Sequence, residues 1–164
     1  MLLFTFLNQA DYNIDMEIER KYLIKNDNWR KLSTKKIIIK QGYISTNPES
    51  TVRIRITDSK SFITIKGKGT ELAHPEFEYE IPTKDAEEMF GLFCKNTGIE
   101  KIRHIVEYEG HIWEIDEFGG RHKGLVFAEV ELKDEEEKVL LPDWIGEEVT
   151  GNPRYYNSNL AKLK

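Results

Sequence analysis

Cysteine, proline and long apolar runs are scarce in this sequence, and each scarcity excludes something. The 164 residues include one cysteine, Cys94, so no internal disulfide bond can form and a reducing, cytoplasmic location is the simplest expectation. The apolar run Leu2–Leu7 is too short for a transmembrane helix and lacks the basic flank of a signal peptide. We therefore expect neither a membrane partner nor a membrane anchor.

Several familiar catalytic patterns are also missing. The four histidines, spread between His74 and His122, do not form a zinc-type pair on one strand. The Gly67–Gly69 segment is typical of a hairpin turn and not of a phosphate-binding glycine loop. No order of serine, histidine and acid, or of cysteine and histidine, indicates a covalent nucleophile. The net charge of −5 also argues against a nucleic-acid partner.

What the sequence does contain is period-2 alternation over most of its length, which indicates β-strands separated by turn residues. Two helices interrupt the pattern, and the longer one is expected to have Thr83 as its N-cap and Gly98 beyond its end. The expected strands are Asp15–Ile24, Lys36–Ser45, Thr51–Thr57, Ser61–Lys68, Glu76–Ile81, Lys101–Glu109, His111–Phe118 and Leu125–Leu132. The expected helices are Asn28–Leu32 and Asp85–Asn96, with short helices over Trp144–Glu148 and from about Ser158 in a less regular tail.

Charged residues of one sign recur in pairs on single strands. Side chains at positions i and i+2 of a strand share a face, so Arg53 and Arg55 point one way, as do Glu129 and Glu131. The simplest interpretation of one such strand is an amphipathic sheet with its charged face in water. Repetition over most strands, sorted by sign, is instead typical of a site that holds cations between carboxylates and anions between basic groups.

These pairs predict an α+β fold that is mostly β: a closed antiparallel barrel of about eight strands, covered by a few helices. The charged faces would line its interior, where water, a divalent metal and a polyanion would satisfy them. Clustered carboxylates favour Mg²⁺, Mn²⁺ or Ca²⁺ over zinc. The expected interior residues are Glu17, Glu19, Lys21, Arg53, Arg55, Lys66, Glu76, Glu78, Glu80, Lys101, Arg103, Glu114, Asp116, Glu129 and Glu131.

An ordered series of motifs resembles the CYTH family, also called triphosphate tunnel metalloenzymes, and in particular the short bacterial inorganic triphosphatases. It covers about residues 16–164 as one domain and leaves residues 1–15 as an N-terminal extension outside the barrel. The series begins with the acidic and basic signature of Glu17–Lys21 and continues through Gln41-Gly42-Tyr43, Arg53-Ile54-Arg55, Thr64-Ile65-Lys66, Glu76–Glu80, Lys101-Ile102-Arg103, Trp113–Asp116, Ala128–Leu132 and Arg154–Asn157.

The resemblance implies a tunnel that uses a divalent metal to cleave triphosphates. It implies Mg²⁺ or Mn²⁺ as cofactor, held by Glu17, Glu19, Glu129 and Glu131, with Asp116 as a further ligand. It implies phosphate contacts from Lys21, Arg53, Arg55, Lys66, Lys101, Arg103 and Arg154. Lys21 and Tyr43 resemble a catalytic lysine–tyrosine pair, and Glu78 is a candidate for activating the attacking water. The segments at His74-Pro75 and Gly119–Gly124 depart from the family pattern, which leaves substrate preference open.

The partner indicated is a small-molecule triphosphate, with hydrolysis of inorganic triphosphate to phosphate and pyrophosphate as the first hypothesis. A thiamine or nucleoside triphosphatase belongs to the same class of enzyme. A class IV adenylyl cyclase would share the fold, but the sequence has no distinctive base-binding cluster. A polyphosphate-binding module without turnover would have no use for the acidic pairs. A homodimer is compatible with the sequence, which does not decide the oligomeric state.

Overall fold

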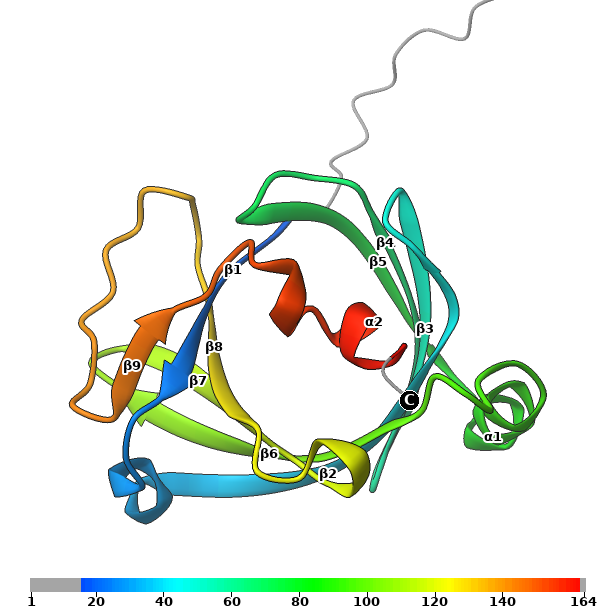
Figure 1. Cartoon of the computed structure of the whole chain (residues 1–164), viewed down its shortest axis with the longest axis horizontal. Helices are drawn as coiled ribbons and strands as arrows, with labels where there is room; N and C mark the ends of the chain where they lie inside the picture. Colours follow the sequence, from blue (N-terminus) through cyan, green and yellow to red (C-terminus); the bar gives the residue numbers. More distant parts are fainter. Residues whose placement is uncertain (1–15, 163–164) are drawn as a thin grey trace, which may run out of the picture.

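In the computed structural model, which describes residues 16–162, the strands form a closed ring (Figure 1). Their order is β5-β4-β3-β2-β6-β7-β8-β1, and a further pairing of β1 with β5 closes the barrel. A ninth strand, β9, lies beside β1. The strands are β1 (Met16–Ile24), β2 (Ser33–Asn47), β3 (Ser50–Thr57), β4 (Ser61–Gly67), β5 (Ala73–Ile81), β6 (Ile99–Tyr108), β7 (His111–Phe118), β8 (Val126–Glu131) and β9 (Ile145–Glu148). The closed antiparallel eight-stranded barrel predicted from the charge pattern is therefore confirmed.

Strand β1 is the element that closes the ring. One of its edges pairs with β8 from Glu19 to Leu23. Its other edge pairs first with β5, where Met16 faces Pro75, and then with β9 near Ile24. The predicted extension, residues 1–15, lies outside the described residues and stays a prediction.

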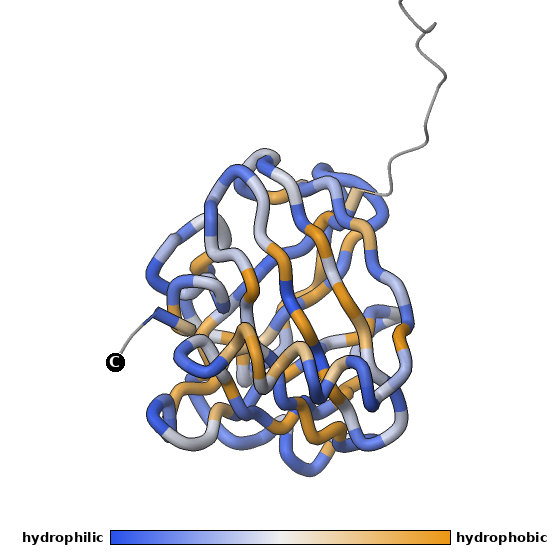
Figure 2. Tube along the Cα trace, turned by 90° about the vertical axis from the view of Figure 1, so that its right-hand side faces the viewer, coloured by the Kyte–Doolittle hydropathy of each residue, from blue (hydrophilic) through white to orange (hydrophobic). Residues whose placement is uncertain are grey.

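Polar and apolar faces alternate along the strands as the sequence predicted. On β8, Glu129 faces the interior, whereas Ala128 and Val130 are fully buried in the outer core. Figure 2 looks onto the side of the barrel that carries α1 and shows hydrophobic and hydrophilic stretches following one another along the chain. Because side chains alternate along a strand, the register of strand pairing decides whether the charged or the apolar side chains face the barrel interior.

The helical segments are η1 (Asn28–Lys31), α1 (Thr83–Phe93), η2 (Gly120–His122), η3 (Pro153–Tyr155) and α2 (Asn157–Leu160). Helix α1 and the segment η1 cover parts of the outer surface, whereas α2 lies inside the ring of strands (Figure 1). Helix α1 packs Ala86 against Ile54 of β3, with the buried Cys94 just past its end. The prediction that Thr83 caps this helix is wrong: Thr83 is its first residue, Pro82 precedes it, and the Thr83 hydroxyl accepts a hydrogen bond from Ser61 (3.1 Å).

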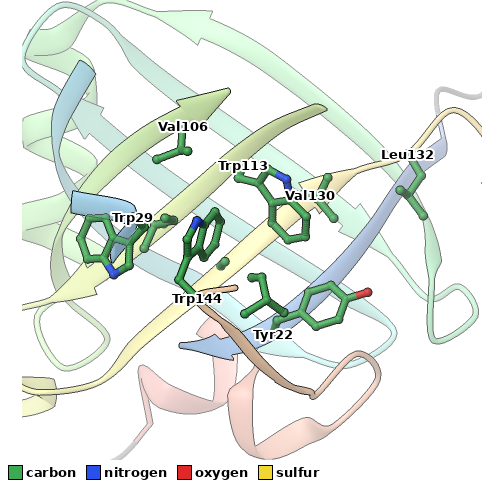
Figure 3. Packing of buried hydrophobic residues seen from close by; sticks show 10 residues of the cluster. Tyr22, Trp29, Val106, Trp113, Val130, Leu132 and Trp144 are labelled. Atoms are coloured by element: carbon green, nitrogen blue, oxygen red, sulfur yellow. The ribbon is translucent and has the colours of Figure 1, made fainter. Parts of the chain in front are cut away.

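The main hydrophobic core lies outside the barrel wall, between the strands and the segments that cross them. Trp113 of β7 packs edge-on against Trp144, with ring centroids 5.4 Å apart, and its ring centroid is 5.7 Å from that of Tyr22 (Figure 3). Trp29 of η1 is fully buried in the same cluster. These large apolar contacts hold the outer layer on the barrel, since buried aromatic area dominates the energetics of such cores.

The predicted helix over Trp144–Glu148 is wrong, because Ile145–Glu148 forms strand β9. Its register places Tyr22 opposite Glu148 and Ile24 opposite Ile145. The free edge of β1 and the aromatic pocket for Trp144 decide this conformation, and neither is visible as a local sequence pattern.

The C-terminal segment lies inside the ring of strands in Figure 1. Leu160 and Ala161 pack against Tyr43, Phe118 and Phe127, whose side chains face the barrel interior. This apolar cluster therefore fills one end of the interior. Among residues 16–162, no helix combines the length and apolarity needed to cross a bilayer.

Candidate active site

Two adjoining cavities occupy the barrel interior. The first, called the charged cavity, has a volume of about 560 Å³ and is lined almost entirely by ionisable side chains. The second cavity, of about 280 Å³, lies toward the C-terminal segment and includes Lys21, Tyr43 and His74 in its wall. The charged cavity is lined by Met16, Glu17, Glu19, Arg53, Arg55, Lys66, Glu76, Glu78, Arg103, Glu114, Glu129, Glu131 and Asn157.

The pairing of β1 with β8 brings acidic side chains together. Glu19 lies opposite Glu131, and Lys21 lies opposite Glu129. The Lys21 Nζ is 2.7 Å from Glu129 Oε1, and both side chains are buried. Although burial alone would raise the pKa of Glu129, the neighbouring Lys21 and Arg103 lower it well below its usual range. Glu129 is therefore ionised at neutral pH.

Arg103 of β6 organises the floor of the charged cavity. Its Nε donates to Asp116 Oδ1 (2.8 Å), and its Nη2 donates to Asp116 Oδ2 (2.7 Å) and to Glu129 Oε2 (2.9 Å). Lys101 also donates to Asp116, and Arg103 to Glu114. Burial opposes ionisation of Asp116, but Arg103 and Lys101 more than offset it and lower the pKa of this carboxyl. Both Asp116 oxygens are thus engaged by basic side chains.

The two arginines of β3 converge on one carboxylate. Arg55 Nη2 donates to both Glu78 oxygens (2.7 and 2.8 Å), and Arg53 Nη2 lies 3.4 Å from Glu78 Oε2. The Thr64 hydroxyl donates to the same Glu78 Oε2 (2.7 Å) and accepts from Arg53 Nη2 (3.1 Å). Cross-strand register explains this group, because Arg53 lies opposite Thr64, which lies opposite Glu78.

At the junction of the two cavities, Lys66 pairs with Glu17 and lies 3.4 Å from Glu76 Oε2. The pKa of Lys66 is raised, because Glu19, Glu17 and Glu76 outweigh the effect of its burial. Burial and neighbouring carboxylates raise the pKa values of Glu17 and Glu19 in turn. The carboxylates of Glu17 and Glu19 are therefore crowded by groups of like charge.

Lys21 and Tyr43, the predicted catalytic pair, both line the second cavity. Burial opposes the charge on Lys21, but Glu129 and Glu19 outweigh it and raise its pKa. Burial also raises the pKa of Tyr43 above that of a free phenol. Both groups therefore keep their protons at neutral pH and can act as hydrogen-bond donors.

Most of the predicted site residues line one or both cavities. The exceptions are Lys101, Asp116 and Arg154. Lys101 and Asp116 are buried together beneath the charged cavity. Arg154 is exposed, and its guanidinium lies 5.9 Å from the Tyr155 ring centroid. Glu80, predicted to face the interior, pairs with Lys60 (2.7 Å) where both side chains are about half exposed. The roles assigned to these residues stay predictions.

Asn157 and Thr64 are two residues of the site for which the sequence predicted no role. Asn157, at the start of α2, lines both cavities, and its Oδ1 is buried without a hydrogen-bond partner within residues 16–162. The sequence signal for Asn157 is its position in the Arg154–Asn157 motif, in which Arg154 is the residue predicted to contact phosphate. Thr64 shares a strand face with Lys66, which was the corresponding signal for its place beside Glu78.

The sequence is similar to those of known proteins over nearly its whole length. The family model described as "CYTH domain" matches residues 15–162. A protein of Acetivibrio thermocellus named inorganic triphosphatase is 45% identical over 146 residues, which is 89% of this chain and 93% of that protein. A protein of Nitrosomonas europaea with the same name is 33% identical over 149 residues, covering 88% of this chain and 96% of that protein.

Solved structures give the same result for the fold. The crystal structure of the inorganic triphosphatase NE1496 superposes with a TM-score of 0.65 at 29% identity, covering 90% of this chain and 95% of that one. A putative adenylyl cyclase from Hippeastrum superposes with a TM-score of 0.56 at 18% identity, covering 72% and 80%, and this likeness concerns the fold alone. With a matching family model over nearly all of its length and two close relatives, this chain belongs to the CYTH domain family.

Proposed function

We propose that this protein hydrolyses inorganic triphosphate to phosphate and pyrophosphate, with Mg²⁺ or Mn²⁺ as cofactor. The observation that carries the proposal is the charged cavity, which is lined by both basic groups and carboxylates. The basic groups can bind a polyanion, and the carboxylates can bind the cation that accompanies it. The two relatives described above bear the name inorganic triphosphatase, which supports the same substrate.

The basic residues that face the cavities are suited to a chain of phosphates. Arginine guanidinium groups bind phosphate oxygens in a planar, bidentate manner, and lysine adds a point charge. Arg53, Arg55 and Arg103 line the charged cavity, and Lys66 lies at its junction with the second cavity. Phosphoryl transfer depends mainly on positioning and charge neutralisation, which this arrangement supplies. Lys101 and Arg154 are further candidates that the sequence predicts.

The acidic residues fit a hard divalent cation. Glu17, Glu19, Glu129 and Glu131 line the same cavity, and carboxylate oxygens are the ligands that Mg²⁺ and Mn²⁺ prefer. Within residues 16–162, no three acidic, histidine or cysteine side chains are already gathered around one point. Glu17 pairs instead with Lys66 and Glu129 with Lys21, so these side chains must exchange partners to take a cation. Asp116, held by Arg103 and Lys101, remains a predicted ligand of lower accessibility.

Binding of the substrate by the basic residues and binding of the cation by the carboxylates are coupled. A triphosphate takes over the lysines and arginines, and the carboxylates they release become free for the cation. The raised pKa values of Glu17 and Glu19 support this, because a nearby cation would offset the repulsion among the crowded carboxylates. When bound, the cation would neutralise phosphate charge. Lys21 and Tyr43 would donate hydrogen bonds to the reacting end of the substrate.

The experiment that tests the function is a turnover panel. Inorganic triphosphate, ATP and thiamine triphosphate would each be supplied with Mg²⁺ and with Mn²⁺, and phosphate, pyrophosphate and cyclic AMP would be measured. The proposal expects metal-dependent release of phosphate and pyrophosphate from inorganic triphosphate, faster than release from ATP. Cyclic AMP as the main product from ATP, with inorganic triphosphate untouched, would assign the chain as a cyclase. No turnover of any triphosphate with either metal would leave a binding module.

A further inference from the structure

Glu78 occupies the position between Arg53 and Arg55 that an anionic ligand would take. Arg55 donates to both of its oxygens, at 2.7 and 2.8 Å, and Arg53 approaches at 3.4 Å. The Thr64 hydroxyl fixes the same carboxylate from β4, at 2.7 Å. The side chains of Arg53, Arg55 and Glu78 are only 15–26% exposed, so the group is largely shielded from bulk water.

The arginines are not satisfied by this carboxylate alone. The Nε atoms of Arg53 and Arg55 are both buried and have no hydrogen-bond partner in the part of the chain that the structure describes. Burial, Arg53 and Arg103 lower the pKa of Arg55, and the charges of Glu78 and Glu114 do not offset them. One carboxylate therefore holds two guanidinium groups that have capacity for a larger anion.

We infer that Glu78 is an internal competitor for the phosphate site, displaced from Arg53 and Arg55 by each phosphate ligand and returning when the product leaves. The inference rests on the proposed function. A carboxylate and a phosphate oxygen compete for the same N–H donors, since both are acceptors only. Displacing Glu78 weakens the binding of every phosphate ligand by a similar factor.

The consequence for turnover follows from the number of contacts. A triphosphate also reaches Lys66 and Arg103, which line the same cavity, so its many contacts outweigh the cost of displacing Glu78. A single phosphate product makes fewer contacts and is displaced by the returning carboxylate. Glu78 thus lowers affinity across the series and promotes the release of product.

Calorimetric titration of the full-length protein with phosphate, pyrophosphate and inorganic triphosphate, without metal, tests this directly. The variant is Glu78→Gln, which keeps the size of the side chain and removes its charge. We expect each ligand to bind about tenfold more tightly, as for the loss of a competing charge-assisted contact. With metal, inhibition of turnover by pyrophosphate should strengthen by a similar factor. Glu80→Gln is the matched control, because Glu80 follows on the same strand but pairs with exposed Lys60, and its binding should equal wild type.

Other roles for Glu78 predict other results. If Glu78 only positions the arginines, Glu78→Gln weakens binding of all three ligands, which overturns the inference. If Glu78 serves as the base for the attacking water, turnover falls while all three affinities stay unchanged, which also overturns it. Glu78→Asp keeps the charge one methylene further from the arginines, so its affinities should lie between those of wild type and Glu78→Gln, and it serves if the glutamine variant does not fold. Wild-type protein that fails to hydrolyse any triphosphate refutes the proposed function, whereas unchanged affinities in a working enzyme refute only the competitor.

Discussion

Glu19 lies directly opposite Glu131 across the antiparallel pair of β1 and β8. Like charges in directly opposed positions destabilise a sheet, so nothing in folding alone favours this pair. Burial and the neighbouring Glu129 also raise the pKa of Glu19. A cation bound between the two carboxylates would offset their repulsion. Without the cation, the repulsion lowers the stability of the folded protein.

Glu19→Gln should therefore stabilise the metal-free protein while removing its turnover. Because the pKa of Glu19 is raised in the folded state, its ionisation costs stability as pH rises through that value, and the neutral amide avoids this cost. We expect a gain of up to about 1 kcal/mol in the free energy of unfolding at neutral pH. Chemical denaturation without metal measures it, and added Mg²⁺ or Mn²⁺ should raise the melting temperature of wild type but not of the variant. Retained turnover at ordinary metal concentrations would contradict the metal assignment.

Glu129→Gln should have the opposite effect on stability. Glu129 pairs with Lys21 at 2.7 Å and with Arg103 at 2.9 Å, all of them buried or nearly so. Removing the carboxylate leaves the buried Lys21 without its ion pair and takes one acceptor from Arg103, which costs about 3 kcal/mol. Denaturation curves at neutral pH would show it, with Glu80→Gln unchanged as the control.

The stabilisation of the fold by the Glu129 carboxylate should depend on pH. The pKa of Glu129 is lowered from its ordinary value of 4.5, so its stabilisation is complete above that value and is lost as pH falls through the folded-state value. The difference in stability between wild type and Glu129→Gln should consequently shrink below about pH 4.5. A difference that stays constant down to pH 3 would show that the Lys21 and Arg103 pairs are not its source.

Tyr43→Phe tests the predicted lysine–tyrosine pair. Burial raises the pKa of Tyr43, so the phenol is protonated throughout the neutral range and can donate a hydrogen bond to a phosphate oxygen. Removing a hydrogen bond to a charged group should reduce turnover roughly ten- to hundredfold. Because Tyr43 does not titrate below about pH 10, where a free phenol does, the pH–rate profiles of wild type and Tyr43→Phe should have the same shape up to that pH. Full turnover in the variant would remove Tyr43 from the site.

Arg55→Ala should raise the KM for inorganic triphosphate strongly, by roughly tenfold or more, because a charge-assisted contact is worth about 1.5–3 kcal/mol. Arg154→Ala provides the comparison within the same chain. Arg154 is exposed beside Tyr155, whereas Arg55 lines the charged cavity, so the structure favours the larger loss at Arg55. An equal loss in both variants, measured by steady-state kinetics, would place Arg154 at the substrate as the sequence predicts.

Much of this protein follows from the order of its residues. Strand periodicity is a local property, and paired charges such as Arg53 and Arg55 or Glu129 and Glu131 were sufficient to predict a closed barrel with a charged interior. The opposite faces of the same strands carry Tyr22, Trp113 and Val130, which are buried in the outer core.

Tertiary structure decided what depends on contacts between distant segments. The tail at Ile145–Glu148 is a strand only because β1 has a free edge and Trp144 finds a pocket beside Trp113. Asn157, and not Arg154, enters the cavities because Leu160 and Ala161 anchor the C-terminal segment among inward-facing aromatic rings. Likewise, sequence places Glu78 on an inner face, but only the register of β3, β4 and β5 brings its carboxylate between Arg53 and Arg55. Which charge meets which depends on strand register and chain closure, and these are set by packing over the whole barrel and not by neighbours in sequence.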